Sequence, residues 1–306
     1  MAAGVAVVTD SAACLPADVA VARGVVVVPL RLIGGTLAGD DGDPGLGAAL
    51  DEAASGGARL TSARPSPEAF AVAYRQAAAG GASAVVSVHL SGLLSGTAGS
   101  AELAAETSVV PVTVVDSRSA GLGLGLAVLA AATIAAAGGS PGDVADAALR
   151  SASQARSFFV LDPADAMAPG GRLAAGRPDP GGTGPRLVAR PVLELSAGRI
   201  CLVERVRTRA SAAMRLVELA AGAAAGIAEQ PPPPGARAGV AVGVQYTGAR
   251  DRAVELAGRL TEAIPQAGRA RMVKAAGAIR VHAGLGLLGV TVGPCAGGWP
   301  QVAPGW

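Results

Sequence analysis

The sequence is poor in the side chains that many active sites and nucleic-acid surfaces use. Aromatic residues make up only 2% of the 306 residues, and the chain holds two histidines and one lysine, Lys274. With few rings to stack on bases and a formal net charge of +2 without a basic run, we expect no nucleic-acid partner. Two histidines exclude a histidine-rich metal site. The single lysine stands outside any phosphate-binding loop, which excludes a Walker-type nucleotide grip.

Cysteine is also scarce. The three cysteines, Cys14, Cys201 and Cys295, lie far apart and form no CxxC pair. An odd number of widely spaced cysteines favours reduced thiols over disulfides or a zinc site, so we expect a cytoplasmic protein. The first residues, "MAAGVAVVTDS", carry no basic stretch, and Asp10 interrupts the apolar run too early for a signal peptide.

One uncharged segment, Ala120–Gly139, is long enough to cross a bilayer. It consists mostly of alanine and glycine and follows a strand-like run that ends in Asp116. This composition favours a buried helix. We therefore expect no stable membrane span and at most transient membrane contact.

Apolar residues are abundant, at 51%, and the first half alternates short β-branched runs with alanine-rich stretches. The expected strands are Val5–Thr9, Val25–Leu30, Ala84–Val88 and Val112–Asp116. The expected helices are Pro16–Arg23, Ser66–Ala79, Thr97–Thr107, Leu122–Ala137 and Pro141–Ala152. Continuous apolar strands separated by helices predict a mostly parallel sheet covered on both faces, a three-layer α/β/α domain over residues 1–153.

The second half, residues 154–306, predicts an α+β domain with antiparallel pairing. Val192–Thr208 reads as a hairpin turning at Ala197-Gly198. The other expected elements are helices over Ser211–Ala228 and Arg250–Ile264, a strand over Val240–Tyr246, and strand-like runs around a glycine-rich bend in Met272–Val292. Glycine and proline in Gly176–Arg186 predict a mobile loop.

Three polar clusters follow the strands of the expected parallel sheet. They are "TDSAACLP" (Thr9–Pro16), "HLSGLLSGT" (His89–Thr97) and "DSRSAGLG" (Asp116–Gly123). In open α/β sheets ligands bind beyond the carboxyl ends of the strands. The three clusters therefore predict a site at one edge of the sheet.

The second cluster places Ser95, Gly96 and Thr97 at a helix start. A serine there can act as an N-cap alone, or its hydroxyl and the free backbone N–H groups can hold an anion. The turn offers a third hydroxyl, Ser91, which is more than one cap needs. Both interpretations stay open. A third pairs Ser95 with His282 as a nucleophile and its base.

The glycines of "GLGLG" (Gly121–Gly125) have the wrong spacing for a dinucleotide fingerprint, and no acidic residue follows at the right distance. They favour close helix packing instead.

Taken together, these segments resemble the DegV family of bacterial fatty-acid-binding proteins. The matching segments, in order, are "VTDSAACLP", "VVPLRL", "PSPEAF", "SVHLSGLLSGTAGSAELAA", "VVDSRSAGLGLG", "GGRL", "RPVLELSAGRICLVERVRT" and "HAGLGLLG". The resemblance implies a two-domain α/β protein with a long-chain fatty acid between the domains, its carboxylate held by hydroxyls and its acyl chain in an apolar tunnel. It also implies the carrier component of a fatty acid kinase system. A separate ATP-binding subunit would phosphorylate the carboxylate, and this chain would need no catalytic residue, metal or cofactor of its own.

Carried over by position, Ser95 matches the serine that takes the carboxylate, with the amide of Gly96 beside it, and His282 matches a histidine near the same group. The family pattern Thr-Ser-x-Pro-Ser-Pro reads "TSARPSP" here, one residue longer. Alignment from Pro65 puts Ser62 at the family's threonine, whereas a one-residue insertion restores Thr61. Both residues are candidates.

The resemblance further implies that Arg172 and Arg207 face the kinase subunit. The chain departs from the family pattern at Gly92, where a second serine is frequent, at Leu285, where proline is common, and at Val281, where threonine often precedes the histidine. Two alternatives to the carrier remain: a serine-dependent acyl hydrolase using Ser95 and His282, and a lipid sensor without a kinase partner.

Overall fold

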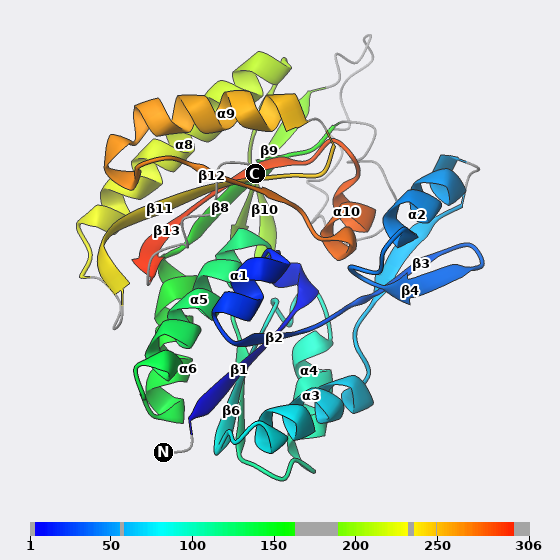
Figure 1. Ribbon diagram of the computed structural model, residues 1–306. Coiled ribbons are helices and arrows are strands. Elements are labelled where there is room, and N and C mark those ends of the chain that lie inside the picture. Colours follow the sequence, from blue (N-terminus) through cyan, green and yellow to red (C-terminus); the bar gives the residue numbers. More distant parts are fainter. Residues whose placement is uncertain (1–3, 56–57, 163–188, 232–235, 249, 297–306) are drawn as a thin grey trace.

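A four-stranded parallel sheet forms the N-terminal half of the protein (Figure 1). The computed structural model describes residues 4–55, 58–162, 189–231, 236–248 and 250–296. The strands are β1 (Val5–Asp10), β2 (Val25–Val28), β6 (Ala84–His89) and β7 (Val112–Asp116), in the order β2-β1-β6-β7. All strand pairs are parallel, so the carboxyl ends of the four strands meet at one edge. The predicted parallel sheet is confirmed.

Helices cover both faces of this sheet because its strands are apolar on both sides. On β1, Val8 joins the cluster under α3 (Pro67–Ala79) and α4 (Thr97–Ala105), whereas Val7 joins the cluster under α5 (Leu122–Ala136). A short helix α1 (Ala17–Ala22) and a 3-10 turn, η1 (Ser11–Ala13), follow β1. Helix α6 (Pro141–Gln154) packs beside α5 and starts at a capping box formed by Ser140 and Asp143. The three-layer α/β/α arrangement is therefore confirmed.

A small antiparallel sheet, which the sequence patterns did not predict, lies between β2 and α3. It comprises β3 (Arg31–Gly34), β4 (Leu37–Asp40) and β5 (Leu60–Ala63) in the order β4-β3-β5, with α2 (Leu46–Ser55) between β4 and β5. Each strand has four residues, too few for a visible alternation of polar and apolar side chains. This small sheet projects to one side of the molecule in Figure 1.

A six-stranded sheet forms the C-terminal half, in the order β10-β9-β8-β13-β11-β12. The strands are β8 (Arg156–Val160), β9 (Arg190–Ser196), β10 (Arg199–Val206), β11 (Ala236–Tyr246), β12 (Arg271–Lys274) and β13 (Leu288–Ala296). All pairs are antiparallel except β11 with β12, and β9–β10 is the predicted hairpin. Helices α8 (Arg209–Ala228) and α9 (Arg250–Ala263) pack on this sheet, and the 3-10 turn η2 (Pro265–Ala267) follows α9.

The strand-like runs expected in Met272–Val292 are β12 and β13, and a glycine-rich turn precedes β13 as expected. The stretch also contains a helix that the sequence did not predict, α10 (Gly277–Ala283), between the two strands. His282 therefore lies on the last turn of a helix rather than in a bend.

Helices α5 and α6 form a layer that both sheets share. Leu124 and Val128 of α5 pack toward the parallel sheet. On the opposite side, Leu126 faces Gly293 of β13, where an added Cβ would lie 2.6 Å from its Cδ1. This double contact leaves α5 buried from Leu122 to Ala132, as predicted for the uncharged segment. A domain division at residue 153 stays a prediction; α6 ends at Gln154 and β8 already pairs within the six-stranded sheet.

By length and composition alone, α8 is apolar enough to cross a membrane. In the structure it lies against the six-stranded sheet and buries Leu216, Ala220 and Ala224 in the core of that half.

Candidate functional site

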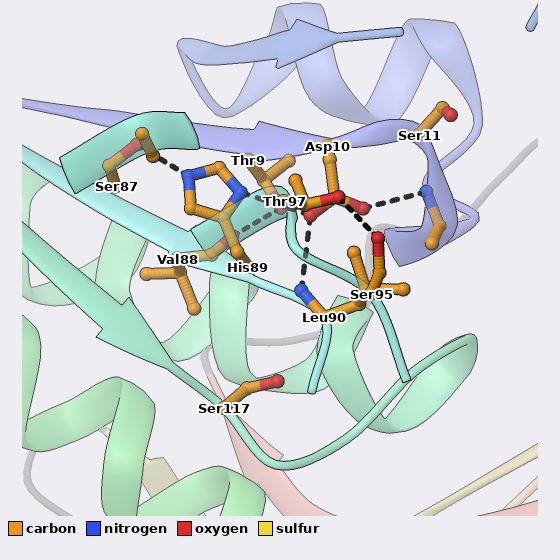
Figure 2. A network of polar contacts seen from close by, with 12 residues as sticks. Thr9, Asp10, Ser11, Ser87, Val88, His89, Leu90, Ser95, Thr97 and Ser117 are labelled. Atoms are coloured by element: carbon orange, nitrogen blue, oxygen red, sulfur yellow. Dashed lines mark hydrogen bonds and ion pairs between the residues drawn. The ribbon is translucent and has the colours of Figure 1, made fainter. Parts of the chain in front are cut away.

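The turn from β6 into α4 contains the hydroxyl groups expected to bind an anion. Helix α4 begins at Thr97, and its N-cap residue is Gly96, which makes no side-chain capping bond. The interpretation of Ser95 as the cap is wrong, since glycine occupies that position. The Oγ of Ser95 instead lies 2.9 Å from Oγ1 of the buried Thr97 (Figure 2). Ser95 itself is half-buried.

Ser91, four residues earlier, serves a structural purpose. Its buried hydroxyl donates to the carbonyl oxygen of Gly198 at 2.9 Å and accepts from the N–H of Leu93 at 3.2 Å. Gly198 lies in the turn of the β9–β10 hairpin, so this bond joins the two halves of the protein. A hydroxyl engaged on both sides leaves little capacity for a ligand.

The structure brings Ser62 and His282 together. Ser62 Oγ of β5 lies 2.8 Å from Nε2 of His282, although the two residues are 220 positions apart. Thr61 is exposed, and neighbouring residues of a strand point to opposite faces. Of the two hydroxyls that the sequence left open, Ser62 is therefore the one directed toward α10.

An aspartate from the small sheet fixes the start of α10. Asp41 accepts hydrogen bonds from the N–H groups of Gly277 at 2.8 Å and Ala278 at 3.0 Å. The same carboxylate accepts from the hydroxyl of Ser11 at 2.9 Å. These three bonds tie η1, the β4–α2 turn and α10 to one carboxylate, and so help to position His282 one and a half turns later.

The far end of α10 is tied to the same region. Arg280 forms an ion pair with Asp51 of α2 and donates to the carbonyl oxygen of Gly47 at 3.3 Å. Thr247, after β11, donates to the carbonyl oxygen of Gly284 at 2.7 Å, just beyond the helix. Polar contacts at both ends thus hold the short helix, in addition to the packing of Ala278 and Val281 on the core.

Arg64 connects the Ser62 strand with the Ser95 turn. It lies two residues after Ser62, and its side chain passes over Gly96. A Cβ added to Gly96 would lie 2.4 Å from Nη1 of Arg64 and 3.2 Å from its Cδ. The guanidinium of an exposed arginine is therefore adjacent to the residue that follows Ser95.

A chain of buried hydrogen bonds, which the sequence motifs did not predict, lies next to the turn from β6 into α4. Nδ1 of His89 lies 2.9 Å from Oδ2 of Asp10, and Nε2 lies 2.7 Å from Oγ of Ser87 (Figure 2). Tyr74 of α3 donates to Ser87 at 2.9 Å, and Asp10 also accepts from the N–H of Leu90 at 3.1 Å. The sequence contained a signal for it: Ser87 and His89 alternate along one strand, and Asp10 ends the neighbouring strand.

The hydrogen-bonded order Asp10–His89–Ser87 is that of a catalytic triad, but these residues have no access to solvent. Asp10, His89 and Ser87 are fully buried, and Ser87 is closed off by Tyr74. Burial raises the pKa of Tyr74 to about 12, partly offset by its bond to Ser87, so the phenol stays protonated. A serine without access cannot attack a substrate. The network instead fixes the carboxyl ends of β1 and β6, where the segments Thr9–Pro16 and His89–Thr97 leave the sheet.

A cavity of about 670 Å³ lies between the two halves. Its lining is mostly apolar and comes from η1, α1, β2, β12 and the residues around them, including Cys14, Val25, Val27, Met272 and Val273. Neither Ser62, Ser95 nor His282 lines it. The cavity therefore adjoins the start of α10, whereas His282 lies at the other end of that helix.

The thiol of Cys14 borders this cavity and is held inside. Its Sγ accepts from Nε2 of Gln245 at 2.9 Å and from the N–H of Ala276 at 3.3 Å. Burial raises the pKa of the Cys14 thiol to about 12, so the group is neutral.

Other predicted residues have simpler outcomes. Gly125 permits close packing of α5, because a Cβ there would lie 2.7 Å from the carbonyl oxygen of Ala13. Arg207 is exposed between β10 and α8. Arg172 and the stretch Gly176–Arg186 lie outside the described residues. Within the described ranges, no group of three or more His, Cys, Asp or Glu side chains could hold a metal ion.

Comparison with protein families gives one match that spans most of the chain. A family model described as an uncharacterised protein of the DegV family matches residues 4–294. A DegV domain-containing protein of Streptomyces coelicolor is 38% identical over 94% of this chain and 98% of its own length. One of Mycobacterium tuberculosis is 32% identical over 94% of this chain and 96% of its own length.

Solved structures similar to this chain are also DegV family proteins. A structure described as fatty acid binding of a DegV family protein from Thermus thermophilus has a TM-score of 0.83 and 29% identity, covering 95% of this chain and 99% of that one. DegV of Bacillus subtilis, described as a fatty acid binding protein, has a TM-score of 0.80 at 24% identity, covering 96% and 100%; it shows the same fold.

Proposed function

This chain belongs to the DegV family, and from that premise we propose that it binds one long-chain fatty acid and holds it by the carboxylate. The observation that carries the proposal is the 2.8 Å contact between Ser62 and His282 at the end of β5. Arg64 links this pair to the turn of Ser95. The Thermus thermophilus protein of the same fold, whose structure is described as fatty acid binding, supports the choice of ligand.

The carboxylate end of such a ligand needs donors. A carboxylate that leaves water is stabilised only when two or three hydrogen bonds replace its hydration. Ser62, Ser95 and His282 each carry a polar hydrogen or can present one, and the amide of Gly96 lies at the first turn of α4. Thr61 is exposed and alternates with Ser62 along β5, so we leave it out of the proposed set.

The acyl end needs an apolar path. Transfer of sixteen carbons out of water is favourable by on the order of 10 kcal/mol, at roughly 0.8 kcal/mol per methylene. An apolar cluster adjoins His282 through Ile279 and Ala283 of α10, which pack against the buried Leu161 and Leu193. We propose that the acyl chain enters between the two halves along this cluster.

We propose further that the protein is a cytoplasmic, non-catalytic subunit. A separate ATP-binding kinase subunit would supply ATP. An oxygen of the bound carboxylate would attack the γ-phosphorus, and the bond to the β–γ bridging oxygen would break, which gives an acyl phosphate and ADP. The exposed Arg207, together with Arg172, is proposed to face that subunit. A lipid sensor is the alternative if no such subunit forms acyl phosphate with this protein.

The Ser62–His282 contact also favours a second candidate. A serine within hydrogen-bond reach of a histidine is the start of a nucleophile–base pair, so an acyl hydrolase built on His282 with Ser62 or Ser95 is the competing function. Turnover of a nitrophenyl ester that Ser62→Ala or Ser95→Ala abolishes would support the hydrolase. No turnover would eliminate it.

Native mass spectrometry of the purified protein tests the main proposal. We expect a 1:1 complex whose extracted ligand is a long-chain fatty acid. Protein that remains empty after addition of palmitate or oleate would overturn fatty acid binding. Incubation with ATP and a kinase subunit then tests phosphorylation, with acyl phosphate trapped by hydroxylamine as the readout.

A further inference from the structure

Arg64 is a cation placed beside the proposed carboxylate site without a counter-charge. Within the described part of the chain, no hydrogen bond or ion pair holds its guanidinium, whereas Arg31, Arg190 and Arg280 each pair with an aspartate. Its side chain nevertheless has a defined place, over Gly96. A guanidinium has five N–H donors and no acceptor, so an anion is its natural partner.

The position of Arg64 depends on two local features. Arg64 directly follows β5 and precedes Pro65, so the strand that carries Ser62 also fixes where the Arg64 side chain starts. Gly96 leaves the space that the guanidinium occupies, since any Cβ there would collide with Nη1 at 2.4 Å. The backbone of Gly96 has φ −78°, which every residue adopts, so an alanine there would be unstrained and would act by pushing the flexible end of Arg64 aside.

The other polar groups of the site do not by themselves select for charge. A serine hydroxyl or a neutral imidazole can bond to the oxygen of an alcohol or an ester as well as to a carboxylate. An arginine distinguishes them, because its charge-assisted bonds to an anion are about twice as strong as neutral ones.

We propose that Arg64 is the residue that makes this site specific for an anionic headgroup. The inference rests on the proposed function, since it assigns the headgroup of the same ligand. Arg64 donates to the carboxylate from the side of Gly96, while Ser62, Ser95 and His282 hold it from within. Neutral lipids of equal chain length then bind more weakly than the acid.

Binding of palmitate and hexadecanol to the full chain tests this proposal. Arg64→Ala should weaken palmitate binding tenfold or more, the effect of losing one charge-assisted bond, and change hexadecanol binding less than about twofold. Arg64→Lys should restore part of the preference. The matched control is Arg75→Ala, which removes another exposed arginine, on α3, and should leave the binding of both ligands unaffected.

Gly96→Ala provides an independent route to the same result. The new methyl group displaces the guanidinium and should reproduce the loss of palmitate preference without removing the arginine. In an Arg64→Ala background it should add little. Equal weakening of palmitate and hexadecanol, or unchanged palmitate binding, by Arg64→Ala overturns the role of Arg64 while fatty acid binding stands. A wild-type protein that binds no palmitate overturns both.

Discussion

Replacement of Asp41 by alanine should release the first turn of helix α10 and displace His282, which lies on the last turn of the same helix. The carboxylate accepts three bonds, from the N–H groups of Gly277 and Ala278 and from the hydroxyl of Ser11. Asp41 is half-buried, so water replaces part of what is lost. We therefore take about 1 kcal/mol for each bond, the typical value for an uncharged hydrogen bond, rather than the larger value for a buried charge. We therefore expect Asp41→Ala to lower the free energy of unfolding by about 3 kcal/mol.

The neighbouring residue is a matched control. Asp40 pairs with Arg31 at 3.0 Å, with both side chains about half exposed, and such surface pairs contribute about 0–1 kcal/mol. Urea unfolding followed by circular dichroism should therefore separate the two alanine variants by about 2 kcal/mol or more. Asp41→Ala should also weaken palmitate binding, whereas Asp40→Ala should not. Equal unfolding free energies for the two variants would refute the assignment of Asp41 as the anchor of α10.

Three further outcomes follow from the same geometry. Ser62→Ala should reduce palmitate affinity about tenfold in a fluorescent fatty acid displacement assay, since one carboxylate donor is lost, whereas Thr61→Ala should leave it within twofold. At pH 8, a thiol reagent should label the exposed Cys201 in the native protein and reach Cys14 only in urea, because burial raises the pKa of the Cys14 thiol to about 12. Labelling of Cys14 in the native protein would contradict its buried position. The pKa of Tyr74 is raised from 10.0 to about 12, so its contribution to the free energy of unfolding is complete below pH 10 and is lost as the pH rises through 12. Tyr74→Phe should make the unfolding free energy fall less steeply with pH in this range. An unchanged slope would argue against a buried phenol.

The parts of the fold that could be predicted are those with a long, regular pattern. Local sequence is enough to predict the strand Ala84–His89, which is mostly apolar and buried throughout. The same holds for the helix Pro67–Ala79, which begins with a serine cap followed by a proline. The small sheet could not be found this way, because its four-residue strands owe their existence to pairing with one another and to α10. Helix α10 was missed for a similar reason. Its seven residues, of which the first is Gly277, are too few to show a helical period, and its first turn is held by Asp41, more than 200 positions away.

The site divides in the same manner. The sequence alone pointed to Ser95, Gly96 and the strand ends, because hydroxyls and free N–H groups at a helix start can hold an anion and because this turn resembles the family pattern. The choice between Thr61 and Ser62 required the register of β5 against β3 and the position of α10. Arg64 drew no attention as one arginine among many. Only its placement over Gly96, a contact between segments 32 positions apart, sets it apart from the rest.

The shared helix layer has a consequence for how a ligand could come and go. Helix α5 is packed between two sheets, with Leu124 facing one and Leu126 facing the other. A hinge opening of the two halves would have to separate this helix from one sheet and expose its leucines to water. The free-energy cost would be roughly 25 cal/mol for each Å² of apolar surface exposed. The short α10 and the four-residue strands beside it pack on the core only through a few side chains such as Leu32 and Ala278, and their remaining contacts are individual hydrogen bonds and ion pairs that can break singly. We expect the ligand to exchange through local unfolding of these small elements, while both sheets stay packed against α5.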